Sequence, residues 1–217
     1  MQPYKIEPLT TPPRGVVIAS GPSLTVEHIH RLSLVEENLF IVGVNNAFEI
    51  CPFLNVLHAA DHTWWENYAD EVPEHIDWFS TWDASSKPSF KIDSRINYLS
   101  GIPGHGFAKN TNELVLGGHG GHHAIQIAMH YGCREILLLG LDMCRLDGKA
   151  HWFGDYPVAE MNRRIRYDSY QPQMTAGASQ AIKRGVRIIN CSLRSAVSCF
   201  PKMTLDDALK APVASIQ

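Results

Sequence analysis

Short apolar runs alternate with amphipathic segments along most of the chain. Seven runs are continuous enough to be strands buried on both faces: residues 16–19, 39–44, 53–60, 78–82, 96–99, 136–141 and 186–189. Four segments between them have helical periodicity: residues 25–32, 62–72, 124–131 and 176–184. Buried strands separated by helices predict an α/β fold, with a mostly parallel sheet and helices on both faces.

Length and composition are consistent with one domain over residues 1–217. The chain is 45% hydrophobic and its formal net charge is −3, so no global basic field points to nucleic acid or a membrane surface. The longest apolar run, residues 136–141, is too short to cross a bilayer. Residues 1–13 are proline-rich, lack the apolar core of a signal peptide and are expected to form an extended lead-in. Five cysteines without a CxxC pair favour a reducing, cytoplasmic location.

Polar residues follow five of the predicted strands. In a parallel sheet the carboxyl ends of the strands lie along one edge, which is where ligands collect in such folds. The sequence therefore predicts a small-molecule site built from these strand ends. They are Gly21-Pro22-Ser23, Asn45-Asn46, Asp61-His62, Asp142 and Asn190-Cys191-Ser192.

The first of these corners, Gly21-Pro22-Ser23, joins a strand to a helix. A glycine there allows a ligand to approach the backbone, and the following helix offers unpaired N–H groups and a positive dipole end. This pattern predicts an anion cradle, most simply for a phosphate. It matches neither the Walker loop nor the dinucleotide GxGxxG fingerprint. An ordinary strand-to-helix turn is the alternative interpretation.

A second glycine-rich corner, Gly117 to His123, precedes the predicted helix at residues 124–131. It is expected to hold another part of the same anion. Three histidines, His119, His122 and His123, suggest a metal, but no further ligand with a zinc-site spacing accompanies them. We therefore predict no metal site and interpret them as histidines at a helix start, some touching ligand.

Residues 143–170 are polar and aromatic, without a clear period. A long irregular insertion at a ligand-binding edge is typical of a lid. Its basic residues Arg163, Arg164 and Arg166 could meet a phosphate, a sugar or an acidic acceptor. The alternative is a solvated cationic helix.

Several of these segments, taken in order, resemble a superfamily of Rossmann-like transferases. The segments are VVIASGPSL, VGVNNAF, LHAADHTWWENY and GGHGGHHAIQIAMHYGCREILLLGLDM. Members include bacterial sialyltransferases that use CMP-sialic acid, archaeal-type hydroxymethylpterin diphosphokinases, and phage and bacterial proteins. The resemblance covers about residues 14–155 and implies a single Rossmann-like domain with nucleotide-binding strand ends.

The resemblance also implies roles for individual residues. Positions matching Gly21, Pro22, Ser23 and Asn45 bind the nucleotide in the sialyltransferases, and Asp61 stands where they have a donor-binding asparagine. The Thr-Ser-Gly before their long helix corresponds to His119-Gly120-Gly121. His151 stands where a tyrosine helps to hold the departing phosphate, a role that a histidine could fill as a cation or a donor. Ser169 aligns with the catalytic-base histidine of the family.

These observations predict a transferase that uses a nucleotide-activated donor, most simply a sialyltransferase-like glycosyltransferase with His151 as a catalytic residue. Glycosyl transfer requires no cofactor in this interpretation. One alternative is a pyrophosphokinase that uses ATP and magnesium, with Asp61 and Asp142 as magnesium ligands. Another is a non-catalytic protein that binds a nucleotide or nucleotide signal. The acceptor, whether glycan, nucleic acid or small molecule, and any homo-oligomer are left open.

Overall fold

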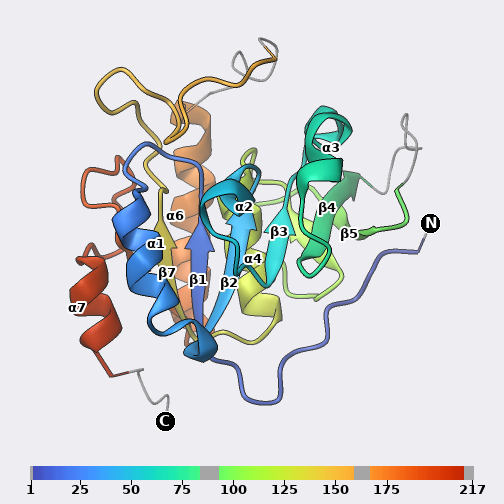
Figure 1. Cartoon of the computed structure of the whole chain (residues 1–217). Coiled ribbons are helices and arrows are strands. Elements are labelled where there is room, and N and C mark those ends of the chain that lie inside the picture. Colours follow the sequence, from blue (N-terminus) through green and yellow to red (C-terminus); the bar gives the residue numbers. More distant parts are fainter. Residues whose placement is uncertain (1, 84–92, 159–166, 213–217) are drawn as a thin grey trace.

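The computed structural model describes residues 2–83, 93–158 and 167–212. Its centre is an eight-stranded sheet in the order β6-β5-β4-β3-β2-β1-β7-β8, and every pair of neighbouring strands is parallel. The predicted α/β class, with a parallel sheet, is thereby confirmed (Figure 1). The strands are β1 (Arg14–Ile18), β2 (Leu39–Val44), β3 (Val56–His58), β4 (Asp77–Asp83), β5 (Ile96–Ile102), β6 (Glu113–Val115), β7 (Glu135–Leu139) and β8 (Arg187–Asn190).

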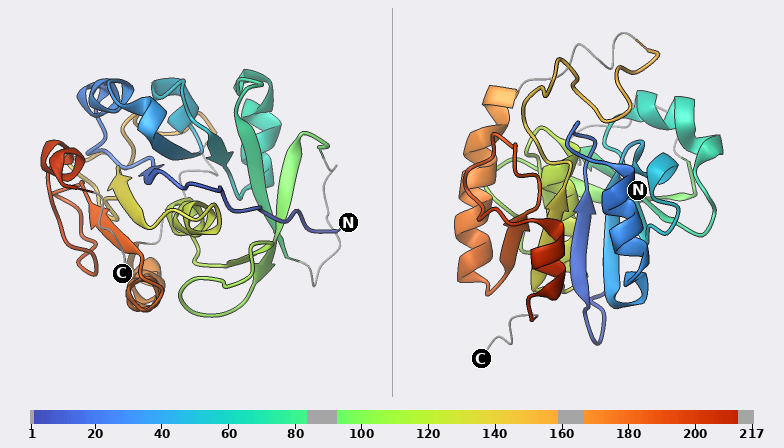
Figure 2. Two further views of the ribbon diagram at one scale, coloured as in Figure 1. Left: turned by 90° about the horizontal axis from the view of Figure 1, so that it is seen from below. Right: turned by 60° about the vertical axis from the view of Figure 1, so that its left-hand side comes forward.

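Helices cover both faces of this sheet. α1 (Val26–Ser33), α2 (Ala47–Ile50), α3 (His62–Tyr68) and α7 (Leu205–Lys210) contribute to one buried apolar cluster. α4 (Gly120–His130) and α6 (Tyr167–Lys183) contribute to the other. Figure 2 shows α4 and α6 on the opposite side of the sheet from α1 and α3. Because successive strand residues point to opposite faces, Val16 and Ile18 enter the first cluster and Val17 the second.

The strand order reverses at β1. The chain builds the sheet outward from β1 through β2 to β6, and then crosses to the other side of β1 to form β7 and β8. A reversal of this kind leaves a crevice at the carboxyl ends of the two strands involved, and it is the usual ligand position in open α/β sheets. Here that position is the space beyond the ends of β1 and β7.

Several predicted boundaries were wrong, and four short elements were missed. The predicted helix at residues 62–72 is α3 followed by a 3-10 turn, η2 (Ala69–Glu71), while a further such turn, η1 (Glu36–Asn38), precedes β2. α6 begins at Tyr167 rather than at residue 176, so the last residues of the predicted lid are helical. Helices α2 and α7 and strand β6 were not predicted, because they span only three to six residues each.

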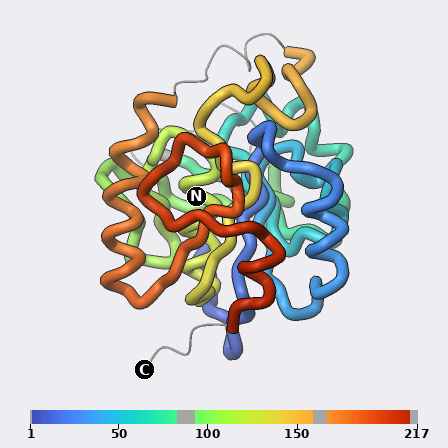
Figure 3. Tube along the Cα trace, turned by 90° about the vertical axis from the view of Figure 1, so that its left-hand side faces the viewer, coloured from blue at the N-terminus to red at the C-terminus, as the bar shows by residue number. Residues whose placement is uncertain are grey.

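The segment after β7 lies over the carboxyl ends of the central strands. Figure 3 shows its described part, residues 143–158, crossing above the sheet between α6 and α1. Arg163, Arg164 and Arg166 of the predicted lid lie outside the described residues. The lead-in at residues 2–13 contains no helix or strand and is held by backbone hydrogen bonds, such as Tyr4 N–H to Tyr98 O (2.8 Å).

No helix within the described ranges is both long and apolar enough to span a bilayer.

Candidate functional site

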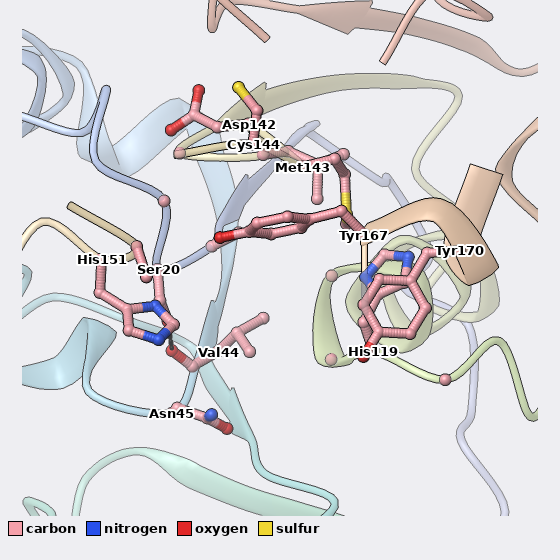
Figure 4. Close-up of a pocket in the computed structure, with 18 of the residues that line it drawn as sticks. Ser20, Val44, Asn45, His119, Asp142, Met143, Cys144, His151, Tyr167 and Tyr170 are labelled. Atoms are coloured by element: carbon pink, nitrogen blue, oxygen red, sulfur yellow. Dashed lines mark hydrogen bonds between the residues drawn. The ribbon is translucent and has the colours of Figure 1, made fainter. Parts of the chain in front are cut away.

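A cavity of about 270 Å³ opens at the strand-order reversal (Figure 4). Four segments that follow strands and the start of two helices form its walls. Its lining residues are Ala19, Ser20, Gly21, Val44, Asn45, Asp61, Gly118 to Gly121, Gly140 to Cys144, Ala150, His151, Tyr156, Tyr167 and Tyr170. Eight of the ten predicted site residues therefore line one pocket; Pro22 and Ser23 do not.

The backbone N–H groups at the Gly21 corner form hydrogen bonds within the protein. The Gly21 N–H donates to the Gly140 carbonyl (2.7 Å), and the Ser23 N–H donates to Asp142 Oδ2 (2.8 Å). A Cβ on Gly21 would lie 2.4 Å from both of those acceptor oxygens. Glycine is therefore required here for a contact within the fold. The donors expected to cradle a phosphate are already used, which argues against the cradle interpretation at this corner.

Asp142 brings a buried carboxyl group to the pocket wall. The residue is 2% exposed, and its Oδ1 is buried without a hydrogen-bond partner among the described residues. Burial raises the pKa of this carboxyl, and the hydrogen bonds from Ser23 oppose that shift. The residues that line the pocket thus include one carboxyl group with a buried oxygen that has no hydrogen-bond partner among the described residues.

Asn45 links the end of β2 to the loop above it. Its backbone adopts φ +52°, a left-handed conformation that asparagine tolerates better than most residues. The side-chain amide donates to the Tyr156 hydroxyl (3.0 Å), so the loop after β7 is tied to a strand end. Sequence reasoning did not identify Tyr156, because this pair is 111 residues apart.

The second glycine corner forms the N-terminus of α4. His119 is the N-cap, and its Nδ1 accepts a hydrogen bond from the His122 N–H (3.2 Å). A Cβ on Gly120 would lie 2.5 Å from Val44 Cγ1, and one on Gly121 would lie 2.5 Å from Leu141 Cδ1. The two glycines thus allow the helix to pack closely on the ends of β2 and β7. They direct its positive end at the cavity.

The other two histidines of this corner lie in the core. His122 and His123 are 0% and 4% exposed and do not line the cavity. His122 Nδ1 contacts Gln126 Nε2 (3.1 Å), and His123 Nδ1 contacts His58 Nε2 (3.0 Å). Burial lowers the pKa of both His122 and His58 to about 4, so these rings are neutral. Within the described ranges, no group of three or more potential metal ligands occurs.

His151 lines the cavity from the loop after β7. Its ring stacks on Phe153 (centroids 5.0 Å apart, planes 7° apart) and lies edge-on to Tyr156. Burial lowers the pKa of His151, with smaller contributions from Ser20 and Asp155 that raise it and from Arg145 that lowers it. The neutral form is favoured, which argues against His151 as a cation that holds a phosphate.

Two tyrosines complete the cavity from the first turn of α6. Tyr167 lies across the opening, and Tyr170 packs against His119 with ring centroids 5.0 Å apart (Figure 4). Sequence reasoning missed both, since it started α6 too late. The signal in the sequence was the spacing of the two tyrosines, three residues apart, which places them on one helix face.

Of the two remaining predicted strand ends, one lines the cavity and the other does not. Asp61 lines the cavity as an exposed residue at the N-cap position of α3. Asn190, Cys191 and Ser192 do not line it, but Ser192 Oγ accepts a hydrogen bond from the Leu141 N–H (3.2 Å) and so supports the loop after β7. The charged lining residues, among those described, are two aspartates; no lysine or arginine lines this pocket.

Comparisons with known proteins give one structural likeness. The chain is similar to the structure of a MAf glycosyltransferase from Magnetospirillum magneticum AMB-1, with a TM-score of 0.56 and 15% sequence identity. The match covers 98% of this chain and 37% of that one, so the chain spans little more than a third of its length. At this identity the likeness shows a shared fold. No family model matches the chain, and a search of curated proteins finds no match.

Proposed function

We propose that this protein is a transferase that binds a nucleotide-activated donor in the cavity and transfers a glycosyl group to an acceptor. The observation that carries the proposal is the cavity itself. It lies at the carboxyl ends of β1, β2 and β7, where the strand order reverses, and it faces the N-terminus of α4. The fold shared with a glycosyltransferase supports the same class.

The phosphate of the donor is assigned to the α4 end of the cavity. An eleven-residue helix directs its positive end there, and the backbone from Gly118 to Gly121 lines the wall. Tyr167 and Tyr170 offer ring faces for the base or sugar, and Asn45 offers a polar side chain at the opposite wall. More specifically, we propose a donor of the CMP-sialic acid type, on the basis of the sequence resemblance to the sialyltransferases.

A second candidate is a pyrophosphokinase that uses ATP and magnesium. The acidic lining favours a reaction that uses magnesium. Asp61 and Asp142 would repel the negative charge of a polyphosphate unless a bound cation compensated it. Magnesium is commonly bound by one or two carboxylates together with substrate phosphates, and the unpartnered Asp142 Oδ1 fits such a role. The ion would neutralise charge on the transferred phosphates. Glycosyl transfer, in contrast, is proposed to need no cofactor.

The proposal can be tested by measuring which nucleotide donors the protein turns over. The protein is incubated with CMP-sialic acid, with UDP-, GDP- and dTDP-sugars, and with ATP plus a hydroxymethylpterin, each with magnesium or with EDTA. Release of CMP or of a nucleoside diphosphate from a sugar donor supports the glycosyltransferase. Magnesium-dependent AMP formation that needs the pterin supports the second candidate. Nucleotide binding, seen as a thermal shift, without turnover of any donor would contradict both and identify a binding protein.

A further inference from the structure

One face of α6 is polar but not exposed. It consists of residues spaced by three and four positions, which places their side chains on the same side of the helix: Tyr170, Gln173, Gly177, Gln180 and Arg184. None of the five is an exposed residue, although glutamine and arginine are mostly exposed in folded proteins. A half-buried polar face of this kind indicates specific hydrogen-bond partners within the fold.

The partners are backbone groups of segment 104–108, which lies between β5 and β6. Two glutamine side chains of α6 each accept from one N–H of this segment and donate to one of its carbonyls. The bonds are Gly106 N–H to Gln173 (3.2 Å), Gln173 to Gly104 O (3.1 Å), Phe107 N–H to Gln180 (2.7 Å) and Gln180 to His105 O (3.1 Å). Each side-chain amide thus pairs with the backbone as a peptide group of a neighbouring strand would.

The packing of α6 on segment 104–108 is close. A Cβ on Gly177 would lie 2.5 Å from Phe107 Cζ, so only glycine allows this approach. Beyond Gly177, Arg184 donates to the Phe107 carbonyl (2.6 Å) and to the Ala108 carbonyl (2.7 Å). Because an α-helix rises about 1.5 Å per residue, a shift of α6 by one residue along its axis would break these bonds.

Segment 104–108 is also bound by α4. Gln126 Oε1 accepts from the Ala108 N–H (2.9 Å), and the Phe107 ring packs against His122 with centroids 5.1 Å apart. The segment therefore connects α4 to α6. The N-terminal residues of these two helices line the cavity together, so the segment determines how the two helix starts are placed relative to each other.

Tyr170 is the end of the polar face that lines the cavity. Its ring packs against His119 with centroids 5.0 Å apart, and a Cβ on Gly118 would lie 2.9 Å from Tyr170 Cε1 (Figure 4). Pro172 lies inside α6 and removes one backbone donor from its first turns. Those turns therefore depend on contacts outside the helix, and the side chain of Gln173, three residues after Tyr170, supplies two of them.

We propose, on the basis of the function above, that Gln173 and Gln180 are positioning residues for the nucleotide. They hold α6 on segment 104–108, so that Tyr170 has a fixed place beside the start of α4 before the ligand binds. A ring that is already fixed loses little conformational entropy on binding, so this wall is preorganised for the base or sugar. Neither glutamine lines the cavity, and both therefore act through the tyrosine.

The substitution Gln180→Met tests the proposal through nucleotide affinity, measured by calorimetry at a temperature where circular dichroism shows the variant to be folded. Methionine has a similar length and lacks the amide that binds Phe107 and His105. Affinity for CMP, UMP, GMP or AMP, whichever the wild type binds, should fall about tenfold, as for one lost aromatic contact. A lower urea midpoint with unchanged affinity would show a merely structural role and overturn the proposal. Gln173→Met provides the same test if Gln180→Met does not fold.

A double-mutant cycle shows whether Gln180 acts through Tyr170. Tyr170→Leu should also lower the affinity about tenfold, and adding Gln180→Met should then change it by less than about twofold. The reason is that a residue which positions a ring has no effect on the ligand once the ring is absent. Losses that multiply to about a hundredfold in the double variant would contradict the proposed route.

The nuclear magnetic resonance signals of the His119 ring test the positioning without a ligand. The Tyr170 ring current acts on them, because the two ring centroids are 5.0 Å apart. In Gln180→Met these signals should move toward their positions in Tyr170→Leu. Unchanged His119 signals in a folded Gln180→Met variant would refute the positioning role.

Lys183→Met is the matched control, because it introduces the same residue at an exposed position of α6 that does not line the cavity. It should leave nucleotide affinity and the His119 signals unchanged. The two levels of the proposal fail differently. A wild type that binds no nucleotide, although the His119 signals move in Gln180→Met, refutes the proposed function. A wild type that binds a nucleotide, together with a Gln180→Met variant that behaves like the control, refutes the positioning role alone.

Discussion

Acidification should destabilise this protein through its buried histidines. His58 and His122 are fully buried, and burial lowers the pKa of each to about 4, against 6.5 in an unfolded chain. The unfolded state therefore binds more protons between pH 6.5 and 4, so stability decreases as the pH falls through this window. From these pKa values, protonation coupled to unfolding costs about 2 kcal/mol per ring at pH 5. A loss of about 4 kcal/mol is large beside a typical stability of about 5–15 kcal/mol.

Urea unfolding at pH 7.5, 6 and 5 measures this effect directly. The midpoint should fall at each step, and His122→Gln should reduce the pH dependence by about one proton, or about 1.4 kcal/mol per pH unit. His30→Asn, at an exposed position, should leave it unchanged. A wild-type stability that is the same at pH 7.5 and pH 5 would show that these rings are not held neutral, and the reasoning would be refuted.

Three further perturbations test the site. Gly21→Ala should destabilise the protein by about 1–3 kcal/mol in urea unfolding, because its Cβ would lie 2.4 Å from the Gly140 carbonyl oxygen; wild-type stability would contradict this packing. Asn45→Ala and Tyr156→Phe should each cost about 0.5–1.5 kcal/mol in the same assay, and fully additive effects would show that the two side chains do not interact. A bound nucleotide should slow amide hydrogen exchange in residues 143–158; unchanged exchange there would count against a lid.

The strand pattern predicted most of the fold because seven of the strands are continuous apolar runs. β6 was missed because it contains only three residues, and α6 was started late because Pro172 interrupts the helical pattern of its first turns. α4 begins at Gly120, four residues before the predicted start, since glycine has low helix propensity and hid its first turn.

The site could be predicted where it depends on topology alone. Parallel strands end at one edge, so Gly21, Asn45 and Asp142 were expected together, and they line one cavity. The role of Gly21 could not be predicted, because its close contact with Asp142 joins residues far apart in the chain. The cap that His119 provides for α4 depends on a hydrogen bond from the His122 N–H within the folded site, which no sequence pattern records.

The central claim, that a nucleotide binds in this cavity, can be tested by the alkylation rate of Cys144. Cys144 is a lining residue of the cavity with a partly buried free thiol, which contacts the Arg194 carbonyl (Sγ–O 3.7 Å). Cys199 has a partly buried free thiol outside the cavity and serves as an internal control. Iodoacetamide labelling is followed by peptide mass spectrometry with and without CMP, UMP, GMP or AMP. The account predicts that the nucleotide that stabilises the protein slows labelling of Cys144 and not of Cys199. A nucleotide that raises the melting temperature and leaves the Cys144 rate unchanged would contradict it.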